Sequence, residues 1–137
     1  MIVLDTHVLL WAIEDERRLG ADARGAIAAA GDSDDIGISA ITPWEVALLV
    51  ERGRLQLAQE VGAWIRSVLA LPGIKLLPID PATATDSARL PGAFRADPAD
   101  RLIIATARQC GAPLLTADFA ILSYAAGGHV QTIDATR

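Results

Sequence analysis

Four acidic residues occupy equivalent places at the ends of predicted strands, although they are far apart in the chain. Asp5 directly follows one short apolar run, and Asp118 lies just past another. Glu45 and Asp100 each fall in the first turn of a predicted helix. Because ligands of open α/β sheets bind outside the carboxyl ends of the strands, all four carboxylates are predicted at one edge of a sheet.

A cluster of this kind predicts a cation site. Two carboxylates about 4 Å apart repel each other by roughly 4 kcal/mol at an effective dielectric constant of about 20. That repulsion is large for a domain whose free energy of unfolding is only about 5–15 kcal/mol, unless protons or cations neutralise it. Ligand sets made only of oxygen suit Mg²⁺ or Mn²⁺, whereas zinc prefers nitrogen and sulfur.

Two of the acids also have a purely structural explanation. The segment Thr42-Pro43-Trp44-Glu45 has the pattern of a capping box, with Thr42 as N-cap and Glu45 at the third helical position. Asp97 has the place of an N-cap before the helix that contains Asp100. Capping is the commoner role for any single acid of this kind. The convergence of all four acids at one edge favours the cation site.

Strands and helices alternate along the chain. Apolar runs predict strands at 2–4, 36–39, 75–79 and 114–116, and a weaker fifth at 130–133. Helical patterns cover 8–13, 21–30, 42–52, 58–70, 83–90 and 99–110. The alternation predicts an α/β fold in three layers, with a central, mostly parallel sheet of four to five strands between two layers of helices. Residues 1–137 are expected to form one domain.

The composition is that of a globular domain, with 52% hydrophobic and 21% charged residues. No run approaches the roughly 18 apolar residues of a membrane span. The N-terminus shows no basic leader before Asp5. The single cysteine, Cys110, excludes an internal disulfide framework and is interpreted as a small apolar helix residue. We therefore expect a cytoplasmic protein with no membrane partner.

The net charge of −5 argues against broad, non-specific binding of nucleic acid. The basic residues are nonetheless almost all arginine, since Lys75 is the only lysine, and arginine pairs with phosphate bidentately. Divalent cations in an acidic site would also offset part of the negative charge. A substrate that binds through bridging metal ions is therefore compatible with this composition.

Four segments carry a resemblance that runs nearly the full length of the chain. They read VLDTHVLLWA, SAITPWEVAL, DPADRLIIATA and LLTADFAI, in this order. In them the sequence resembles the PIN-domain family, specifically its VapC-type toxin ribonucleases of type II toxin–antitoxin systems. The resemblance implies an endoribonuclease that depends on Mg²⁺ or Mn²⁺ and hydrolyses RNA. It also implies a homodimer, and inhibition by a cognate antitoxin protein that covers the active-site groove.

Carried over residue by residue, the family's acidic quartet falls on Asp5, Glu45, Asp100 and Asp118. Asp5 and Asp100 would be the principal metal ligands, and Glu45 and Asp118 would complete the shell or bind a second ion. The metal would activate a water for in-line attack on the scissile phosphate, which leaves 5′-phosphate and 3′-hydroxyl ends. One of the two outer acids would orient that water, and the sequence leaves open which one.

Several residues near the quartet are second-tier candidates. Thr116 matches a hydroxyl that often lies beside the family's site, Thr6 follows the first acid, and Asp97 is the extra acid of a DPxDR form found in one subgroup. Arg101, in the first turn of the same helix, is a candidate phosphate contact, with pairing to an acid or simple exposure as alternatives. His7 is expected to be a hydrogen-bonded structural residue, with a substrate contact as the alternative.

Two other functions compete with this one. A strand ending in Asp-Thr is also typical of phosphatases that form an aspartyl-phosphate, but those need a second acid where this chain has His7. The more serious alternative is an interaction module with a PIN-like fold and little or no nuclease activity, although such a module has no need of four mutually repelling acids. Trp11, Trp44 and Trp64 fit either function as core or dimer-interface anchors, and no role in RNA stacking is assigned to them.

Overall fold

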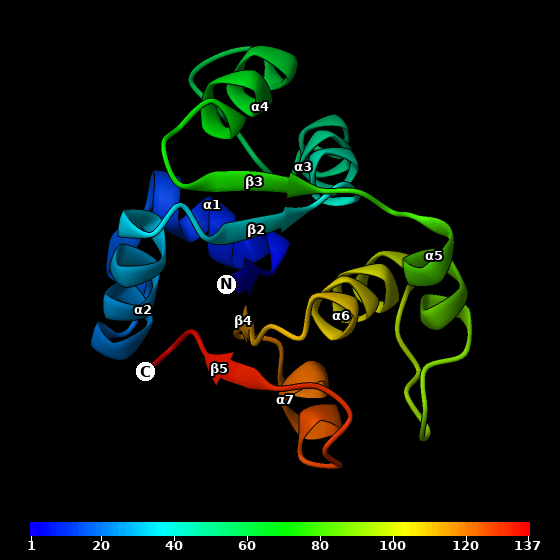
Figure 1. Ribbon diagram of the computed structural model, residues 1–137. Helices are drawn as coiled ribbons and strands as arrows, with labels where there is room; N and C mark the ends of the chain where they lie inside the picture. The colour runs from blue at the N-terminus through cyan, green and yellow to red at the C-terminus, as the bar shows by residue number, and fades with distance from the viewer.

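Five parallel strands form the centre of the fold, in the order β3-β2-β1-β4-β5 (Figure 1). The computed structural model describes all residues from 1 to 137. The strands are β1 (Ile2–Leu4), β2 (Ile36–Ser39), β3 (Ile74–Leu77), β4 (Leu114–Thr116) and β5 (Thr132–Asp134). The central parallel sheet predicted from the sequence is therefore confirmed. The third and fifth strands differ from their predicted ranges by one to two residues at each end.

Seven α-helices and one short 3₁₀-helix connect the strands. They are α1 (Thr6–Glu14), η1 (Glu16–Arg18), α2 (Ala21–Asp32), α3 (Thr42–Glu51), α4 (Val61–Leu69), α5 (Pro81–Ala88), α6 (Pro98–Cys110) and α7 (Phe119–Ala125). Helices α1 to α4 pack on one face of the sheet, and α6 and α7 pack on the other with α5 alongside α6 (Figure 1). The predicted three-layer architecture is confirmed.

The alternation of side chains along the strands divides the core into two clusters. In β1, Leu4 faces the cluster beneath α1 to α4, and Val3 faces the cluster beneath α6 and α7. In β4, Leu115 and Leu114 divide in the same way. Strands that are buried on both faces are apolar at every position, which explains why these short runs contain no polar residue before their last position.

Helix α6 begins and ends as its sequence predicts. The Asp97 carboxylate caps it by accepting a hydrogen bond from the Asp100 amide at 2.9 Å. Gly111 ends it in the left-handed conformation, with φ of 60°. Cys110 is the last residue of the helix, as expected from the sequence, and it is exposed.

Helix α7 was not predicted from the sequence, and helix α4 starts later than predicted. Helix α7 was not predicted because its apolar run is short, with seven residues in the structure. Helix α4 begins at Val61, three residues later than predicted, because the Glu60 carboxylate caps it through the Ala63 amide at 2.8 Å. Both helices therefore start directly after an acidic N-cap.

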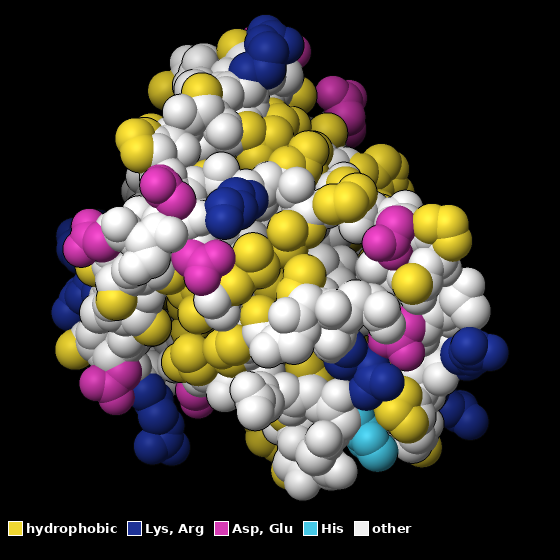
Figure 2. Space-filling view, viewed as in Figure 1, with side chains coloured by type: hydrophobic (Ala, Val, Ile, Leu, Met, Phe, Trp, Pro, Cys, Tyr) yellow, Lys and Arg dark blue, Asp and Glu magenta, His cyan; other side chains and the backbone are white.

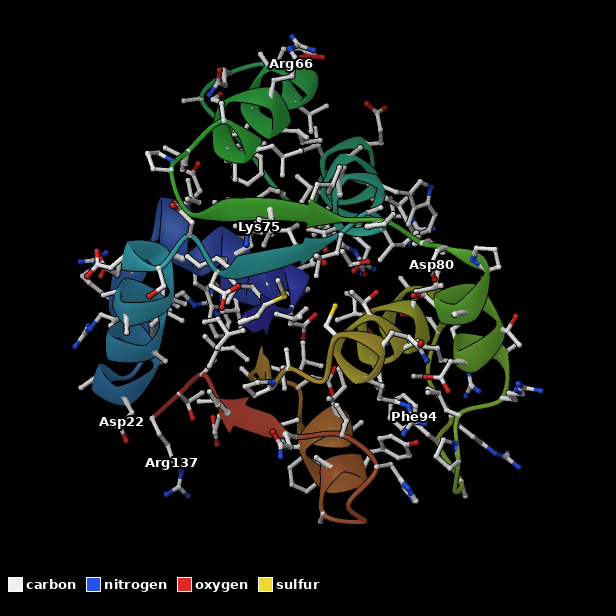
Figure 3. All side chains as sticks on the ribbon, viewed as in Figure 1. Asp22, Arg66, Lys75, Asp80, Phe94 and Arg137 are labelled. Atoms are coloured by element: carbon white, nitrogen blue, oxygen red, sulfur yellow. The ribbon has the colours of Figure 1, made fainter.

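Strand β3 lies at one edge of the sheet and leaves part of its apolar surface exposed. Figure 2 shows apolar side chains gathered on the face of the molecule turned to the viewer, with charged side chains among them. Lys75, labelled in Figure 3, projects from β3 and pairs with Asp35 at 3.7 Å. A charged residue on an edge strand discourages pairing with a second sheet. None of the helices has the length and hydropathy needed to cross a membrane.

Candidate active site

Asp5 lies at the carboxyl end of the central strand and is almost entirely buried, with 6% of its surface exposed. One carboxylate oxygen accepts a hydrogen bond from the Thr6 amide at 2.8 Å, and the other accepts one from the Thr116 hydroxyl at 2.7 Å. Burial raises the pKa of Asp5, and these two hydrogen bonds oppose that rise. A buried acid held by two donors is fixed in position and has little contact with solvent.

Glu45 is joined to the Asp5 side of the site through Thr6. The Thr6 hydroxyl donates to a Glu45 carboxylate oxygen at 2.6 Å and lies 3.1 Å from the Thr42 hydroxyl. The predicted capping box is wrong, because the N-cap of α3 is Ile41 and no side chain caps this helix. Burial raises the pKa of Glu45, and the negative charges of Asp5 and Asp97 raise it further. Glu45 therefore belongs to the acid cluster rather than to the helix end.

Asp100 is the most perturbed acid of the cluster. Burial raises its pKa to about 7, together with the charges of Asp97, Asp5, Glu45 and Asp118 in that order. Residues three, four and seven positions further along α6 are fully buried: Ile103, Ile104 and Ala107. As predicted, Asp100 heads the face of α6 that packs on the sheet. This placement brings its carboxylate within electrostatic range of the other four acids.

Asp118 and Asp97 have structural roles as well. One Asp118 carboxylate oxygen accepts hydrogen bonds from the Ala120 and Ile121 amides at 2.8 and 3.2 Å, which caps α7. The Asp118 amide in turn donates to the Thr116 hydroxyl at 3.0 Å. Each of these acids uses one carboxylate oxygen for its cap and leaves the second without a protein partner. Capping and membership of the cluster are therefore compatible.

The cluster carries negative charge that the protein itself does not balance. None of the five acids Asp5, Glu45, Asp97, Asp100 and Asp118 is in a salt bridge with lysine, arginine or histidine. The donors are all oxygen, as Mg²⁺ and Mn²⁺ prefer. No group of three or more His, Cys, Asp or Glu side chains lies close enough together in this structure to hold a metal ion. The donor chemistry and the unbalanced charge thus fit a divalent cation, whereas a closed set of ligands is not formed.

Arg101 has a structural role that its sequence position did not reveal. Its guanidinium donates to the carbonyl oxygens of Ser87 and Phe94 at 2.8 and 2.6 Å, which ties the loop between α5 and α6 to α6. Phe94, labelled in Figure 3, packs against the ring of Tyr124 with centroids 4.6 Å apart. These contacts give no support to the phosphate contact suggested for Arg101.

A surface cavity of about 380 Å³ adjoins the acid cluster, and three of its residues were missed by the sequence analysis. Glu45 and Asp97 line it together with Trp44, Arg52 and Arg54. His7 also lines it and is exposed, and its side chain makes no hydrogen bond, contrary to the structural role expected for it. No sequence signal marks this cavity, because it depends on the exposure of Trp44 and on the position of Arg54 beside Arg52.

Comparison with known proteins identifies the family that has this parallel sheet with acids at its carboxyl edge. The model of the PIN domain matches residues 2–127, so the chain belongs to the PIN-domain family. Among curated proteins it is similar to ribonuclease VapC22 of Mycobacterium tuberculosis, with 37% identity over 123 residues, 90% of this chain and 91% of that protein.

Solved structures confirm the fold. The chain resembles VapBC2 of Rickettsia felis, bound to a DNA fragment from its promoter, with a TM-score of 0.71, 16% identity and 98% of both chains covered. It also resembles FitAcB of Neisseria gonorrhoeae, with a TM-score of 0.62, 25% identity and 98% of both chains covered. The two structures cover the whole of the α/β/α architecture, which therefore extends beyond the segment matched by the family model.

Proposed function

We propose that this protein is a metal-dependent endoribonuclease that acts as the toxin of a toxin–antitoxin pair. The observation that carries the proposal is the cluster of five carboxylates without a basic partner at the carboxyl edge of a parallel sheet. The similarity to ribonuclease VapC22, a protein of nearly the same length, supports the same reaction. The likeness to the VapBC2 and FitAcB structures supports an antitoxin as partner.

In this proposal Asp5 and Asp100 are the principal ligands of Mg²⁺ or Mn²⁺, and Glu45 and Asp118 complete the site. The bound ion supplies Lewis acidity, which activates water and polarises the scissile phosphate of RNA. Thr116 and Thr6 fix the orientation of Asp5 and Glu45 through their hydroxyl groups. Asp97 contributes negative charge and positions Asp100 through its amide. Hydrolysis leaves a 5′-phosphate and a 3′-hydroxyl.

The raised pKa values determine which acids are ionised, and therefore able to bind a cation, at a given pH. With a pKa of about 7, Asp100 is only partly ionised at neutral pH while the site is empty of positive charge. Binding of a cation favours the ionised form, so metal binding releases protons. At metal concentrations below saturation, cleavage is therefore expected to increase from pH 6 to pH 8, because protons and the cation compete for Asp100. The two neutral hydroxyl groups of Thr6 and Thr116 add no charge to this balance.

The decisive experiment is cleavage of a total cellular RNA pool by the purified protein, with Mg²⁺ or Mn²⁺ and with EDTA. Asp100→Asn removes a principal ligand without changing the size of the side chain, so it is expected to abolish cleavage, with a loss of at least about 100-fold. Asp22→Asn makes the same chemical change in an exposed residue of α2 (Figure 3) and is expected to cleave at the wild-type rate.

Full cleavage in EDTA or by Asp100→Asn would overturn the mechanism. Absence of cleavage by folded wild-type protein, freed of any bound partner, would favour an interaction module with a PIN-like fold. Calorimetry with Mg²⁺ or Mn²⁺ separates the two functions further, since only the nuclease requires a cation in the acid cluster. We also propose that the protein is a homodimer and is located in the cytoplasm. Light scattering on the same sample measures the oligomeric state.

A further inference from the structure

The cavity beside the acid cluster has charged and apolar residues in its walls. The acidic residues Glu45 and Asp97 and the basic residues Arg52 and Arg54 line it, and Glu45 and Arg52 belong to opposite ends of α3. Trp44 and Leu48 line it as well. A cavity of about 380 Å³ with acidic, basic and apolar residues in its walls is suited to a ligand that carries negative charge and a flat apolar group.

Trp44 is exposed in a way that the other two tryptophans are not. Trp64 is buried and donates to Glu14 at 2.6 Å, and Trp11 is covered by the Arg18 guanidinium at 4.5 Å from its ring. Trp44 leaves 54% of its surface exposed. An exposed indole ring beside a reaction site offers a stacking surface that every nucleobase can use.

Helix α3 places this ring in line with a basic group. Trp44, Leu48 and Arg52 are spaced by four residues and therefore follow one face of the helix. From Trp44 to Arg52 the rise along the helix axis is about 12 Å. The face leads from the first turn of α3, which contains Glu45, towards the end of the helix. Trp44 and Glu45 therefore share the first turn of α3, and Arg52 follows its last turn.

The two arginines are available to a ligand. Neither Arg52 nor Arg54 forms a salt bridge or a side-chain hydrogen bond, and both are exposed or partly exposed. This contrasts with Arg108, which binds both carboxylate oxygens of Asp86, and with Arg101, which holds a loop. Unpaired guanidinium groups next to an acid cluster attract phosphate, with which arginine forms paired hydrogen bonds.

We propose that this cavity is a subsite for single-stranded RNA, in which a base next to the cleaved phosphate stacks on Trp44 and a neighbouring phosphate binds Arg52 and Arg54. The proposal rests on the proposed ribonuclease function and adds to it the residues that hold the substrate beside the cleaved bond. A base within a duplex is stacked on both faces and cannot reach the ring, so the subsite selects unpaired RNA. The unpaired guanidinium groups of Arg52 and Arg54 favour an anionic ligand such as a nucleotide, and Trp44 and Leu48 supply apolar surface for its base.

The test measures binding of two probes to Asp100→Asn protein, which does not cleave in the proposed mechanism. One probe is a fluorescein-labelled single-stranded RNA 12-mer of random sequence, and the other is a ribose-phosphate 12-mer without bases. Adding Trp44→Ala is expected to weaken binding of the first probe at least about fivefold, and of the second less than about twofold. Trp44→Phe keeps an aromatic ring and is expected to remain within about threefold of the parent for both probes.

The arginine pair is tested on the same probes. Arg52→Ala with Arg54→Ala is expected to weaken binding of both probes, because both carry phosphates. It also lowers the slope of log affinity against log salt by about 0.7 for each phosphate that no longer pairs with an arginine. Arg66→Ala removes the same charge from α4, outside the cavity (Figure 3), and is expected to change neither affinity nor slope.

Three results would overturn the subsite. They are an equal effect of Trp44→Ala on both probes, no effect on either, and an unchanged salt slope in the arginine variant. Loss of antitoxin binding with full RNA binding in Trp44→Ala would assign the cavity to a protein segment instead. The proposed function fails separately, if wild-type protein does not cleave RNA with Mg²⁺ or Mn²⁺. Base-dependent binding through Trp44 would then still stand as a property of the cavity.

Discussion

At the scale of single residues, the site depends on hydroxyl groups that position carboxylates. Thr116 donates to Asp5 and accepts from the Asp118 amide, and Thr6 donates to Glu45. Both threonines are buried. A hydroxyl can approach a carboxylate closely without neutralising it, so the acids keep their affinity for a cation. Lysine or arginine at the same positions would occupy the site with the wrong charge.

Thr116→Val is expected to destabilise the protein by about 1–3 kcal/mol, because it leaves a buried Asp5 oxygen without its donor. Valine has the same shape as threonine, so the change in stability reports the hydroxyl rather than a cavity. The free energy of unfolding from urea titration checks the magnitude. Thr116→Ser keeps the hydroxyl and is the matched control, expected to stay closer to wild type. Equal stability of the valine variant and wild type would contradict this role.

The metal-free protein is expected to lose stability as the pH rises from about 4 towards 8. An aspartate in an unfolded chain titrates near about 3.9, whereas burial and neighbouring carboxylates raise the pKa of Asp100 to about 7. Between these values the folded protein binds more protons than the unfolded chain, so its free energy of unfolding falls with increasing pH. Thermal unfolding in EDTA should give a higher Tm at pH 5 than at pH 8, and Mg²⁺ should raise Tm most at pH 8.

Asp100→Asn is the control for this pH dependence and is expected to reduce it, while the raised pKa values of Asp5 and Glu45 leave a smaller slope. Hydrogen bonds lower the pKa values of Asp35, Asp80 and Asp134, so the stability these acids contribute is lost only in more acidic solution, below about 3.9. They therefore do not counteract the trend between pH 5 and pH 8. A wild-type slope retained by Asp100→Asn would show that its carboxyl group is not the one that titrates.

At the scale of elements, helix ends determine where the acids point. Asp97 and Asp118 cap α6 and α7, and Glu60 and Asp80 cap α4 and α5. The C-terminal end of α6 uses Gly111 with φ of 60°, where an added Cβ would meet no atom within 4 Å. Gly73, before β3, has φ of 88°, and an added Cβ would lie 2.7 Å from the Gly31 carbonyl oxygen.

Gly111→Ala and Gly73→Ala separate conformational strain from steric overlap. The first is expected to cost about 1–2 kcal/mol, the usual cost of the left-handed conformation for a residue with a Cβ. The second is expected to cost more, because a backbone oxygen must also move away. Urea unfolding of both variants gives the comparison, and Gly111→Asn, which tolerates positive φ, is the control. Equal costs for the two alanine variants would contradict the overlap at Gly73.

Sequence patterns predicted the helices and strands that have a clear apolar pattern or clear capping residues. The apolar runs that became β1, β2 and β4 and the caps of α6 were correct because they depend on local periodicity and on residues such as Asp97 and Gly111. The predicted capping box at Thr42 was wrong because tertiary contacts replace it. The Thr42 hydroxyl contacts the Thr6 hydroxyl, and Glu45 accepts a hydrogen bond from Thr6 within the acid cluster. Helix α7 was missed because it is short and owes its burial to Ile121 and Tyr124, which pack only once the sheet is present.

The candidate site was partly predictable for the same reason. Asp5, Glu45, Asp100 and Asp118 follow strands or open helices, so their shared edge follows from the topology of a parallel sheet. The cavity beside them was not predictable, because it depends on the exposure of Trp44 and on the turn that brings Arg54 next to Arg52. The role of Arg101 was also hidden, since its partners are the backbone carbonyls of Ser87 in α5 and of Phe94 in the following loop, which have no sequence signal.

At the scale of the whole molecule, strand β1 connects the two halves of the core. It is the middle strand of five, with Leu4 in the cluster beneath α1 to α4 and Val3 in the cluster beneath α6 and α7. A loss of packing on one face is therefore transmitted to the other through the same backbone. The three tryptophans lie on α1, α3 and α4, so their fluorescence reports directly on only one of these layers.

Ile103→Val tests whether the two layers unfold together. Ile103 is fully buried in the cluster beneath α6, which contains no tryptophan, and its shortening is expected to cost about 0.5–1.5 kcal/mol. The urea midpoint should shift equally in tryptophan fluorescence and in far-UV circular dichroism, as in two-state unfolding. A shift in circular dichroism alone would show that the layers unfold independently.

The order of strands in the sheet also sets when the protein can first act during its own synthesis. Asp5 is held by Thr116, which lies 111 positions later in the chain. Translation at about 5–20 residues per second separates the appearance of these two residues by roughly 5 to 20 s. During that interval β1 lacks its neighbour β4, and the acids of the site are not assembled. The nascent chain therefore has no assembled acid cluster until nearly all of it has been translated.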